Sequence, residues 1–143
     1  GATLMIIGSF LLTAVHTLFA LPILSYGWFA IIVMILLGIS FSLVPSALWP
    51  SVPKIVPEKN LGTAYSLIYW VQNLGMWAVP IYVGKIFTDT ITEAGNKTQE
   101  ISAAIKAEYV FILLGIIAIG VAIMLLQSSR KNPELGLDSP ASK

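Results

Sequence analysis

The chain has 143 residues, of which 57% are hydrophobic and only 10% are charged, and its mean hydropathy is +0.86. Because an ordinary soluble domain has roughly 25% charged residues, this composition excludes a soluble globular domain. The formal net charge of +1 gives no reason to expect a nucleic-acid partner, and the lack of cysteine excludes disulfides and thiolate metal sites.

Charged residues are confined to a few stretches of the chain. None occurs in residues 1–53, and residues 107–127 contain only Glu108. Apolar runs of about 18 residues or more are long enough to cross the hydrocarbon core of a bilayer. We therefore expect an all-α, multi-pass membrane protein whose residues 1–127 form four transmembrane helices, at about 2–21, 28–49, 62–87 and 108–127.

The first segment is almost wholly apolar, and its polar side chains are isolated from one another. The short connection at residues 22–27 requires the second segment to return antiparallel. His16 is the only histidine of the chain. We expect no neighbour in this chain with which it could relay protons, so the sequence favours a structural role for it.

The second segment carries two serines and a tryptophan on one face, because Ser42, Ser46 and Trp49 recur at helical spacing. Such a face suits a water-filled gap between helices. Small residues four apart are also typical of close helix packing, so packing is the alternative role for Ser46.

The third segment holds two primary amides, Gln72 and Asn73, near its middle. Tyr65, Tyr69 and Met76 share their helical face. Polar side chains at this depth usually face protein or an aqueous cavity, and amides suit a polar solute. The alternative is a hydrogen bond that joins two helices, typically worth about 0.6 kcal/mol, and the aromatic rings could equally be bundle core.

Helix-breaking residues cluster in these two middle segments: Pro45, Pro50, Pro53, Gly75, Pro80 and Gly84. Each proline removes a helix hydrogen bond and bends the chain. Bends suit helices that open and close a gate, although prolines are also frequent in membrane helices generally. The three prolines within nine residues of the second segment favour a helix end that moves when the gate opens and closes.

Two polar stretches complete the chain, an outer one at 88–107 and a tail at 128–143 that we expect to be disordered. Lys and Arg are more numerous in the second turn and the tail than at the other end. The excess of these residues marks the cytoplasmic side. We therefore expect both ends of the chain in the cytoplasm.

Several short motifs resemble the major facilitator superfamily. Gly75, Pro80 and Gly84 are similar to the Gly/Pro-rich pattern of its fifth and eleventh helices. More narrowly, ALWP at 47–50, VPE at 56–58, LGTAY at 61–65 and QNLG at 72–75 resemble the branch that contains the lysosomal dipeptide transporter. The likeness covers about residues 36–89.

The resemblance implies that these are helices nine to twelve of a twelve-helix fold, and that the other eight belong to a longer chain. It further implies a secondary transporter that moves a small polar solute such as a dipeptide by alternating access, without a cofactor, in a bacterial inner membrane or a lysosomal membrane. The alternative is a self-contained four-helix oligomer, either a small exporter or a structural adaptor. The residues offer no catalytic set, so we do not expect an enzyme.

Overall fold

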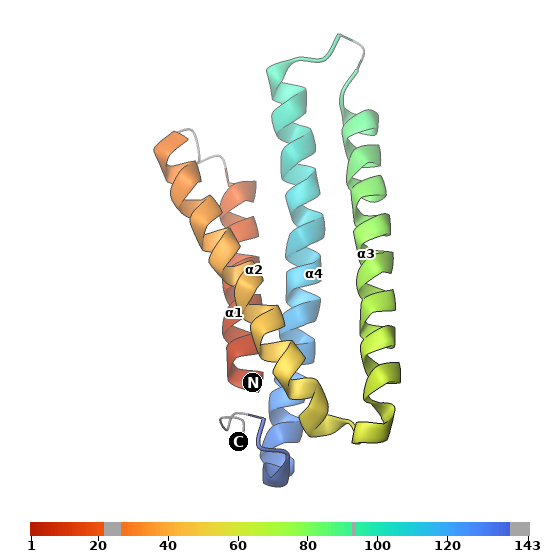
Figure 1. Cartoon of the computed structure of the whole chain (residues 1–143). Coiled ribbons are helices and arrows are strands. Elements are labelled where there is room, and N and C mark those ends of the chain that lie inside the picture. The colour runs from red at the N-terminus through yellow and green to blue at the C-terminus, as the bar shows by residue number, and fades with distance from the viewer. Residues whose placement is uncertain (22–26, 93, 138–143) are drawn as a thin grey trace.

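The computed structural model describes residues 1–21, 27–92 and 94–137, and every regular element in these ranges is helical. The four long helices are α1 (Ala2–Ala20), α2 (Gly27–Ile55), α3 (Leu61–Thr90) and α4 (Lys97–Lys131). Two short 3₁₀ helices follow α2 and α4, namely η2 (Glu58–Asn60) and η3 (Pro133–Leu135). Successive long helices run antiparallel, so Gly1 and η3 lie at the same end of the bundle (Figure 1).

The all-α prediction is confirmed, and four helices are present where four were expected. Three of them, α1, α2 and α4, are long and apolar enough to cross a membrane. Helix α3 has 30 residues, or about 45 Å of length, but it is not among these three. Membrane crossing by α3 therefore stays a prediction.

Helix α2 continues to Ile55, six residues beyond the expected end of its membrane span, and it contains Pro45, Pro50 and Pro53. A proline inside a helix costs one backbone hydrogen bond and strains the preceding turn. Neighbouring helices and side chains can compensate such a loss in membrane proteins. The three prolines therefore lie within a continuous helix.

Helix α4 begins at Lys97, eleven residues before the expected span, because a capping box defines its start. The Asn96 side chain accepts a hydrogen bond from the Gln99 amide at 3.0 Å, and Gln99 Oε1 accepts one from the Asn96 amide at 3.4 Å. This reciprocal arrangement provides acceptors for two backbone N–H groups at the start of the helix, where no preceding turn can provide them. Of the outer polar stretch at 88–107, residues 97–107 consequently belong to α4, and residues 88–90 belong to α3.

The structure describes the tail as far as Leu137. Residues 128–131 complete α4, and the chain then turns back at Gly136, whose φ of 53° lies in the left-handed region. Lys54 Nζ donates a 2.6 Å hydrogen bond to the Gly136 carbonyl, and Leu137 is buried. The rest of the tail, residues 138–143, and the connection at 22–26 lie outside the described residues.

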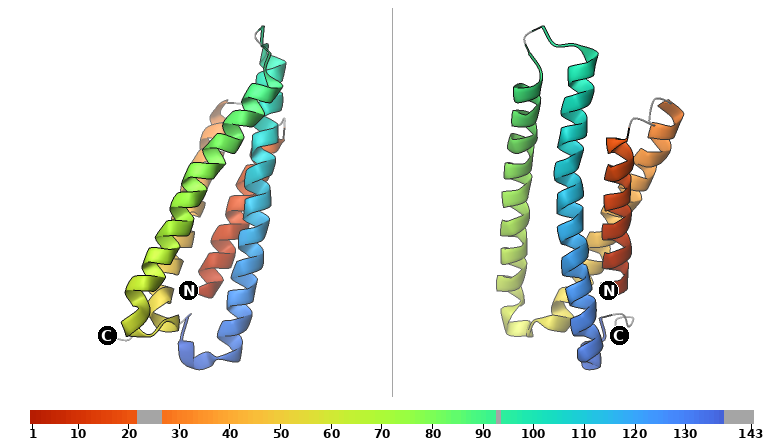
Figure 2. Two further views of the ribbon diagram at one scale, coloured as in Figure 1. Left: turned by 90° about the vertical axis from the view of Figure 1, so that its right-hand side faces the viewer. Right: turned by 180° about the vertical axis from the view of Figure 1, so that it is seen from behind.

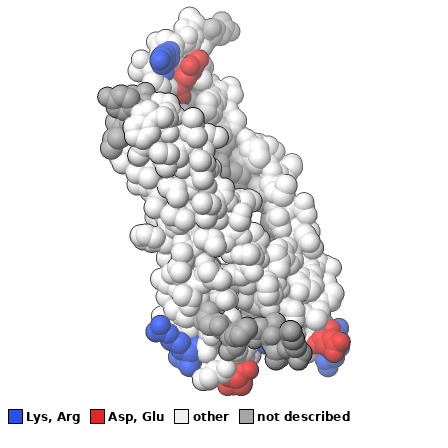
Figure 3. Space-filling view, turned by 60° about the vertical axis from the view of Figure 1, so that its left-hand side comes forward, with Lys and Arg blue, Asp and Glu red and all other residues white. Residues whose placement is uncertain are grey.

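Packing in the bundle is centred on α1, which contacts α4 and α2 along much of its length. Helix α4 lies between α3 and α1 in Figure 1 and in the right-hand view of Figure 2. Helix α3, which is described throughout, has no buried residue, and it meets α2 only near η2. Figure 3 shows charged side chains at the two ends of the molecule and an uncharged band between them.

Two glycines allow the close approach of α1 to its neighbours. A Cβ built on Gly115 of α4 would lie 2.3 Å from Thr13 Oγ1 and 3.3 Å from Thr13 Cα, and one on Gly8 would lie 3.0 Å from two side chains of α2. The Thr13 hydroxyl donates to the Ser9 carbonyl at 2.8 Å. A side chain at position 115 would therefore push α1 and α4 apart.

We predict that Gly115→Ala destabilises the full-length protein by about 1–3 kcal/mol, the usual cost of overpacking. Gly120→Ala on the same helix is the matched control, because a Cβ there would meet no described atom within 4 Å. Thermal unfolding of the two variants in detergent measures the difference. Equal melting temperatures would contradict the close contact at Gly115.

Candidate functional site

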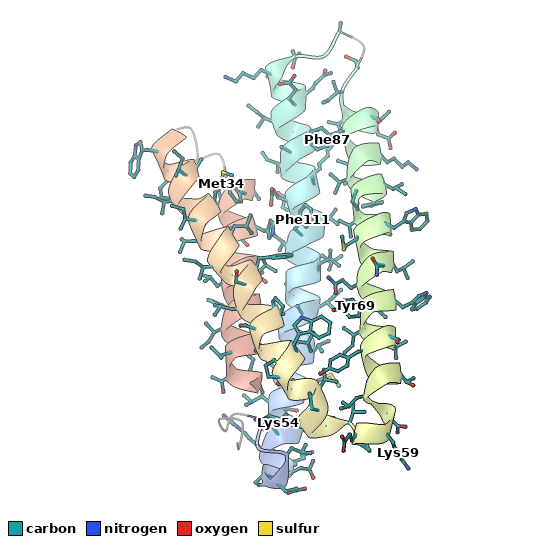
Figure 4. The ribbon with its side chains drawn as sticks, in the orientation of Figure 1. Met34, Lys54, Lys59, Tyr69, Phe87 and Phe111 are labelled. Atoms are coloured by element: carbon teal, nitrogen blue, oxygen red, sulfur yellow. The ribbon has the colours of Figure 1, made fainter. Side chains whose placement is uncertain are left out.

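Three of the predicted site residues meet where α2 crosses α3. The Trp49 ring on α2 lies 5.0 Å from the Tyr69 ring and 5.6 Å from the Tyr65 ring, measured between centroids, with 37° and 32° between the ring planes. Tyr69 points from α3 toward α2 in Figure 4. Aromatic pairs at this distance contribute about 0.5–1.5 kcal/mol beyond the burial of their area. This aromatic cluster (Trp49, Tyr65 and Tyr69) is the main contact between the two helices.

The position of Tyr65 follows from the last proline of α2. Pro53 has no amide proton, so it cannot donate to the carbonyl of Trp49, four residues earlier. The Tyr65 hydroxyl donates to this same carbonyl at 3.4 Å. Helix α3 thus supplies, through the Tyr65 hydroxyl, a donor for the Trp49 carbonyl, which has no backbone donor at Pro53.

A cavity of about 390 Å³ lies beside the cluster. All four long helices contribute to its wall, with Leu12 from α1, Pro45 and Trp49 from α2, Gln72 from α3 and Ala118 from α4. Most of the wall is aliphatic or aromatic, and the Gln72 amide is its polar group from α3. An apolar pocket with a small number of placed polar groups is the usual form of a small-molecule site.

The second amide, Asn73, has a different position. Its Nδ2 donates a 2.8 Å hydrogen bond to the Tyr69 carbonyl of its own helix, and its side chain is exposed. Met76, 66% exposed, lies one turn further along. Among the described residues neither lines the 390 Å³ cavity. Gln72 and Asn73, which are adjacent in the sequence, therefore point to different surroundings.

Ser46 also lies away from Gln72. Its hydroxyl donates to the Leu43 carbonyl at 2.8 Å, and it lines a smaller cavity of about 160 Å³ together with Lys54 and Leu137. Of the predicted face of Ser42, Ser46 and Trp49, only Trp49 thus reaches the α2–α3 crossing. The role of each predicted residue in a transport path stays a prediction.

The predicted bend positions of α3, Gly75, Pro80 and Gly84, all lie within one continuous helix. A Cβ on either glycine would meet no described atom within 4 Å. Packing within the described chain therefore does not require glycine at these positions, and gating by them stays a prediction.

The expectation that His16 has no partner is wrong. Its Nδ1 lies 2.7 Å from Glu108 Oε2 on α4, and its ring stacks on Phe111 with centroids 4.9 Å apart. Both residues stand near the same boundary of their predicted spans, His16 close to the end of the first and Glu108 at the start of the fourth. This matching depth is the signal in the sequence that could have paired them.

These features are those of a multi-pass membrane protein: long apolar helices, charges restricted to the two ends, and a largely apolar cavity with an amide in its wall. We compared the chain with known proteins in three ways to find its relatives. No protein-family model matches the chain, and no solved structure matches it.

Curated relatives do match. The chain is 43% identical over 77 residues to the protein named lysosomal dipeptide transporter MFSD1 from Danio rerio, an alignment that covers 53% of this chain and 17% of the relative. The proteins of the same name from Mus musculus and Homo sapiens are 51% and 49% identical over 59 residues, which is 41% of this chain and 13% of each relative. The predicted resemblance to this branch of the major facilitator superfamily is confirmed over that part of the chain. The alignments span about a sixth of the length of these relatives or less.

The aromatic cluster makes a quantitative prediction about coupling between α2 and α3. A double-mutant cycle of Trp49→Leu and Tyr69→Leu should give a coupling energy of about 0.5–1.5 kcal/mol, because the two rings are in contact. Trp70, 64% exposed, is the matched control, and the cycle of Trp49→Leu with Trp70→Leu should be additive. Thermal unfolding of the full-length protein measures both cycles. Additivity in the first cycle would contradict the cluster.

Proposed function

We propose that this chain is the C-terminal part of a secondary transporter that moves a small polar solute, with dipeptides as the first candidate, by alternating access. Helices α2 and α3 would border the solute path together with helices from the rest of the protein, and α1 and α4 would support them from outside. The similarity to proteins named lysosomal dipeptide transporter and the cavity that α2 and α3 line together with α1 and α4 support this proposal.

The observation that carries the proposal is the contrast between α3 and the other helices. Helix α3 combines two amides and several aromatic rings with the absence, along its whole described length, of any buried residue. A helix with this composition and this exposure needs a surrounding that is partly polar. A water-filled path lined by other helices of the same protein provides it.

A dipeptide fits the groups that α2 and α3 offer. A peptide bond has one donor and one acceptor, which a primary amide such as that of Gln72 can satisfy at once. The rings of the aromatic cluster provide flat apolar surface for side chains of varied shape, or a face for a cationic one. Groups that hold the charged ends of the solute would come from the remaining eight helices.

For the location we propose the lysosomal membrane, the compartment in the names of the relatives, with both ends of the chain in the cytoplasm. Lys54, Lys59, Arg130 and Lys131 stand at the end of the bundle where η2 and η3 lie, and Lys85, Lys97 and Lys106 stand toward the other end. This excess is in the direction expected for a cytoplasmic surface.

The alternative, a self-contained four-helix oligomer, has less support. A proton-driven exporter of that kind needs a carboxylate inside the membrane, and the predicted spans contain only Glu108, which stands at a boundary and pairs with His16. The relatives found are named as transporters and not as enzymes.

Uptake by vesicles that contain the full-length protein tests the proposal directly. We expect uptake of labelled dipeptides to exceed that of sugars and of single amino acids, and to saturate with solute concentration. Vesicles without the protein are the control. Equal rates for all three solutes, or rates equal to the control, would contradict the proposal.

Substitution of the amides tests the role of α3. We expect Gln72→Leu and Asn73→Leu to lower dipeptide uptake roughly tenfold, because each removes hydrogen bonds to the solute worth about 1–1.5 kcal/mol. Stability should change little, since the bond of the Asn73 side chain is local to its own helix. Ser66→Ala is the matched control, because Ser66 is exposed on the same helix and bonds only the Gly62 carbonyl. Unchanged uptake in an amide variant would remove that residue from the solute path.

A further inference from the structure

The last described residues of the chain, 132–137, fold back onto the end of the bundle where α2 finishes, and we call this segment the strap. Its turn is made by η3 and by Gly136, whose φ of 53° lies in the left-handed region that a residue without a Cβ adopts most easily. Leu137 follows and is only 2% exposed. The turn brings Gly136 to Lys54, which is 82 positions away in the sequence.

Two contacts join the strap to the neighbouring helices. Lys54 Nζ donates a 2.6 Å hydrogen bond to the Gly136 carbonyl, and a bond with a charged donor is roughly twice as strong as a neutral one. Leu137 lines the cavity of about 160 Å³ at this end of the bundle, which Leu4 of α1 and Ser51 of α2 also line. The strap thus connects the end of α4 to both α1 and α2.

The part of α2 that the strap contacts is short of backbone hydrogen bonds. Pro50 and Pro53 have no amide proton, so each leaves a carbonyl four residues earlier without its helical donor. The Tyr65 hydroxyl reaches one of these carbonyls, that of Trp49, at 3.4 Å, which is longer than the usual O–H···O distance. Fewer internal bonds lower the free energy needed to open these turns locally.

The hydrophobic core of the bundle does not extend to the last turn of α2. The buried core residues Met5, Ala47 and Ala122 join α1, α2 and α4. Further along α2 the burial continues to Val52, and none of residues 53–55 is buried. The hydrogen bond from Lys54 to the strap therefore acts on a turn that the core does not hold.

We propose that the strap is a releasable fastening that keeps the proline-containing end of α2, residues 50–55, helical and in place against α1. When the strap leaves, Lys54 Nζ and the Gly136 carbonyl exchange their bond for bonds to water, and Leu137 becomes exposed. The last turns of α2 then open locally, while the core keeps the rest of the helix packed.

The alternative is a tail that merely lies on an end of α2 that is stable without it. The two possibilities differ in one measurable respect. Loss of the strap opens residues 50–55 if the strap holds them, and it leaves them unchanged if the tail only rests on them.

A consequence for transport follows from the proposed orientation. It places this end of α2 on the cytoplasmic side, and α2 borders the proposed solute path. The strap would then limit how far α2 moves at the cytoplasmic end of that path. Only this consequence rests on the proposed function, because the hold of the strap on α2 does not depend on which solute is carried.

Hydrogen exchange of the solute-free, full-length protein in nanodiscs tests the proposal. Leu137→Ala removes most of the buried side chain, and Lys54→Met keeps the apolar stem but cannot donate to the strap. In both variants we expect the amides of residues 51–56 to exchange at least about tenfold faster than in the unaltered protein. Residues 33–40 of the same helix are remote from the strap and should keep their rates.

Three further variants are matched controls. Glu134→Ala and Lys59→Met change exposed residues of η3 and η2, and Leu137→Met keeps the buried volume nearly constant. All three should behave as the unaltered protein does. Unchanged exchange at residues 51–56 in Leu137→Ala and Lys54→Met, or equal acceleration at residues 33–40, would overturn the proposal. Because the measurement uses no solute, a failure of dipeptide uptake would leave its result valid.

Discussion

The close approach of α1 to α4 and α2 is the contact on which the rest of the bundle depends. Lipid tails are as apolar as the helix side chains, so the hydrophobic effect does not drive helices together inside a bilayer. Small residues allow the backbones to approach closely, and the resulting packing provides much of the attraction. Gly115 provides this on α4, and Gly8 provides it on α1. With these contacts in place, α4 provides a surface along which α3 can lie without being buried itself.

The loose attachment of α3 fits a helix that borders a moving path. Its contact with α2 is concentrated in the aromatic cluster near η2, and it separates from α2 toward the opposite end (Figure 1). A contact at one end of a helix pair does not constrain the spacing at its other end. In the proposed transporter, the widening gap between α2 and α3 would be occupied by helices outside this chain and by water.

How much the sequence predicts depends on whether a feature is local. The number and class of the helices follow from apolar runs, because a bilayer requires them. Apolar runs do not give the start of α4, because the capping residues Asn96 and Gln99 lie in a polar stretch, or the end of α2, because prolines do not always stop a membrane helix. The difference between Gln72 and Asn73 was also missed. Adjacent residues are about 100° apart on a helix, and a shared polar stripe does not say which of them meets the cavity.

The partner of His16 could not be derived from periodicity, since one helix does not reveal which side chain faces it from another. The aromatic cluster was within reach of the sequence because Trp49, Tyr65 and Tyr69 flank a single short turn. Contacts between residues close in the chain are therefore within reach of the sequence, whereas a pair that only the packing of α1 on α4 brings together is not.

Helix α4 has 35 residues, about 52 Å of rod, against a hydrocarbon layer of about 30 Å. Its first turns, joined to the end of α3 through Lys106 and Thr90, stand above the ends of α1 and α2 (Figure 2). A rod supported near its middle works as a lever. A small tilt of α4 inside the bilayer would therefore produce a larger displacement of this end of the helix, outside the bilayer.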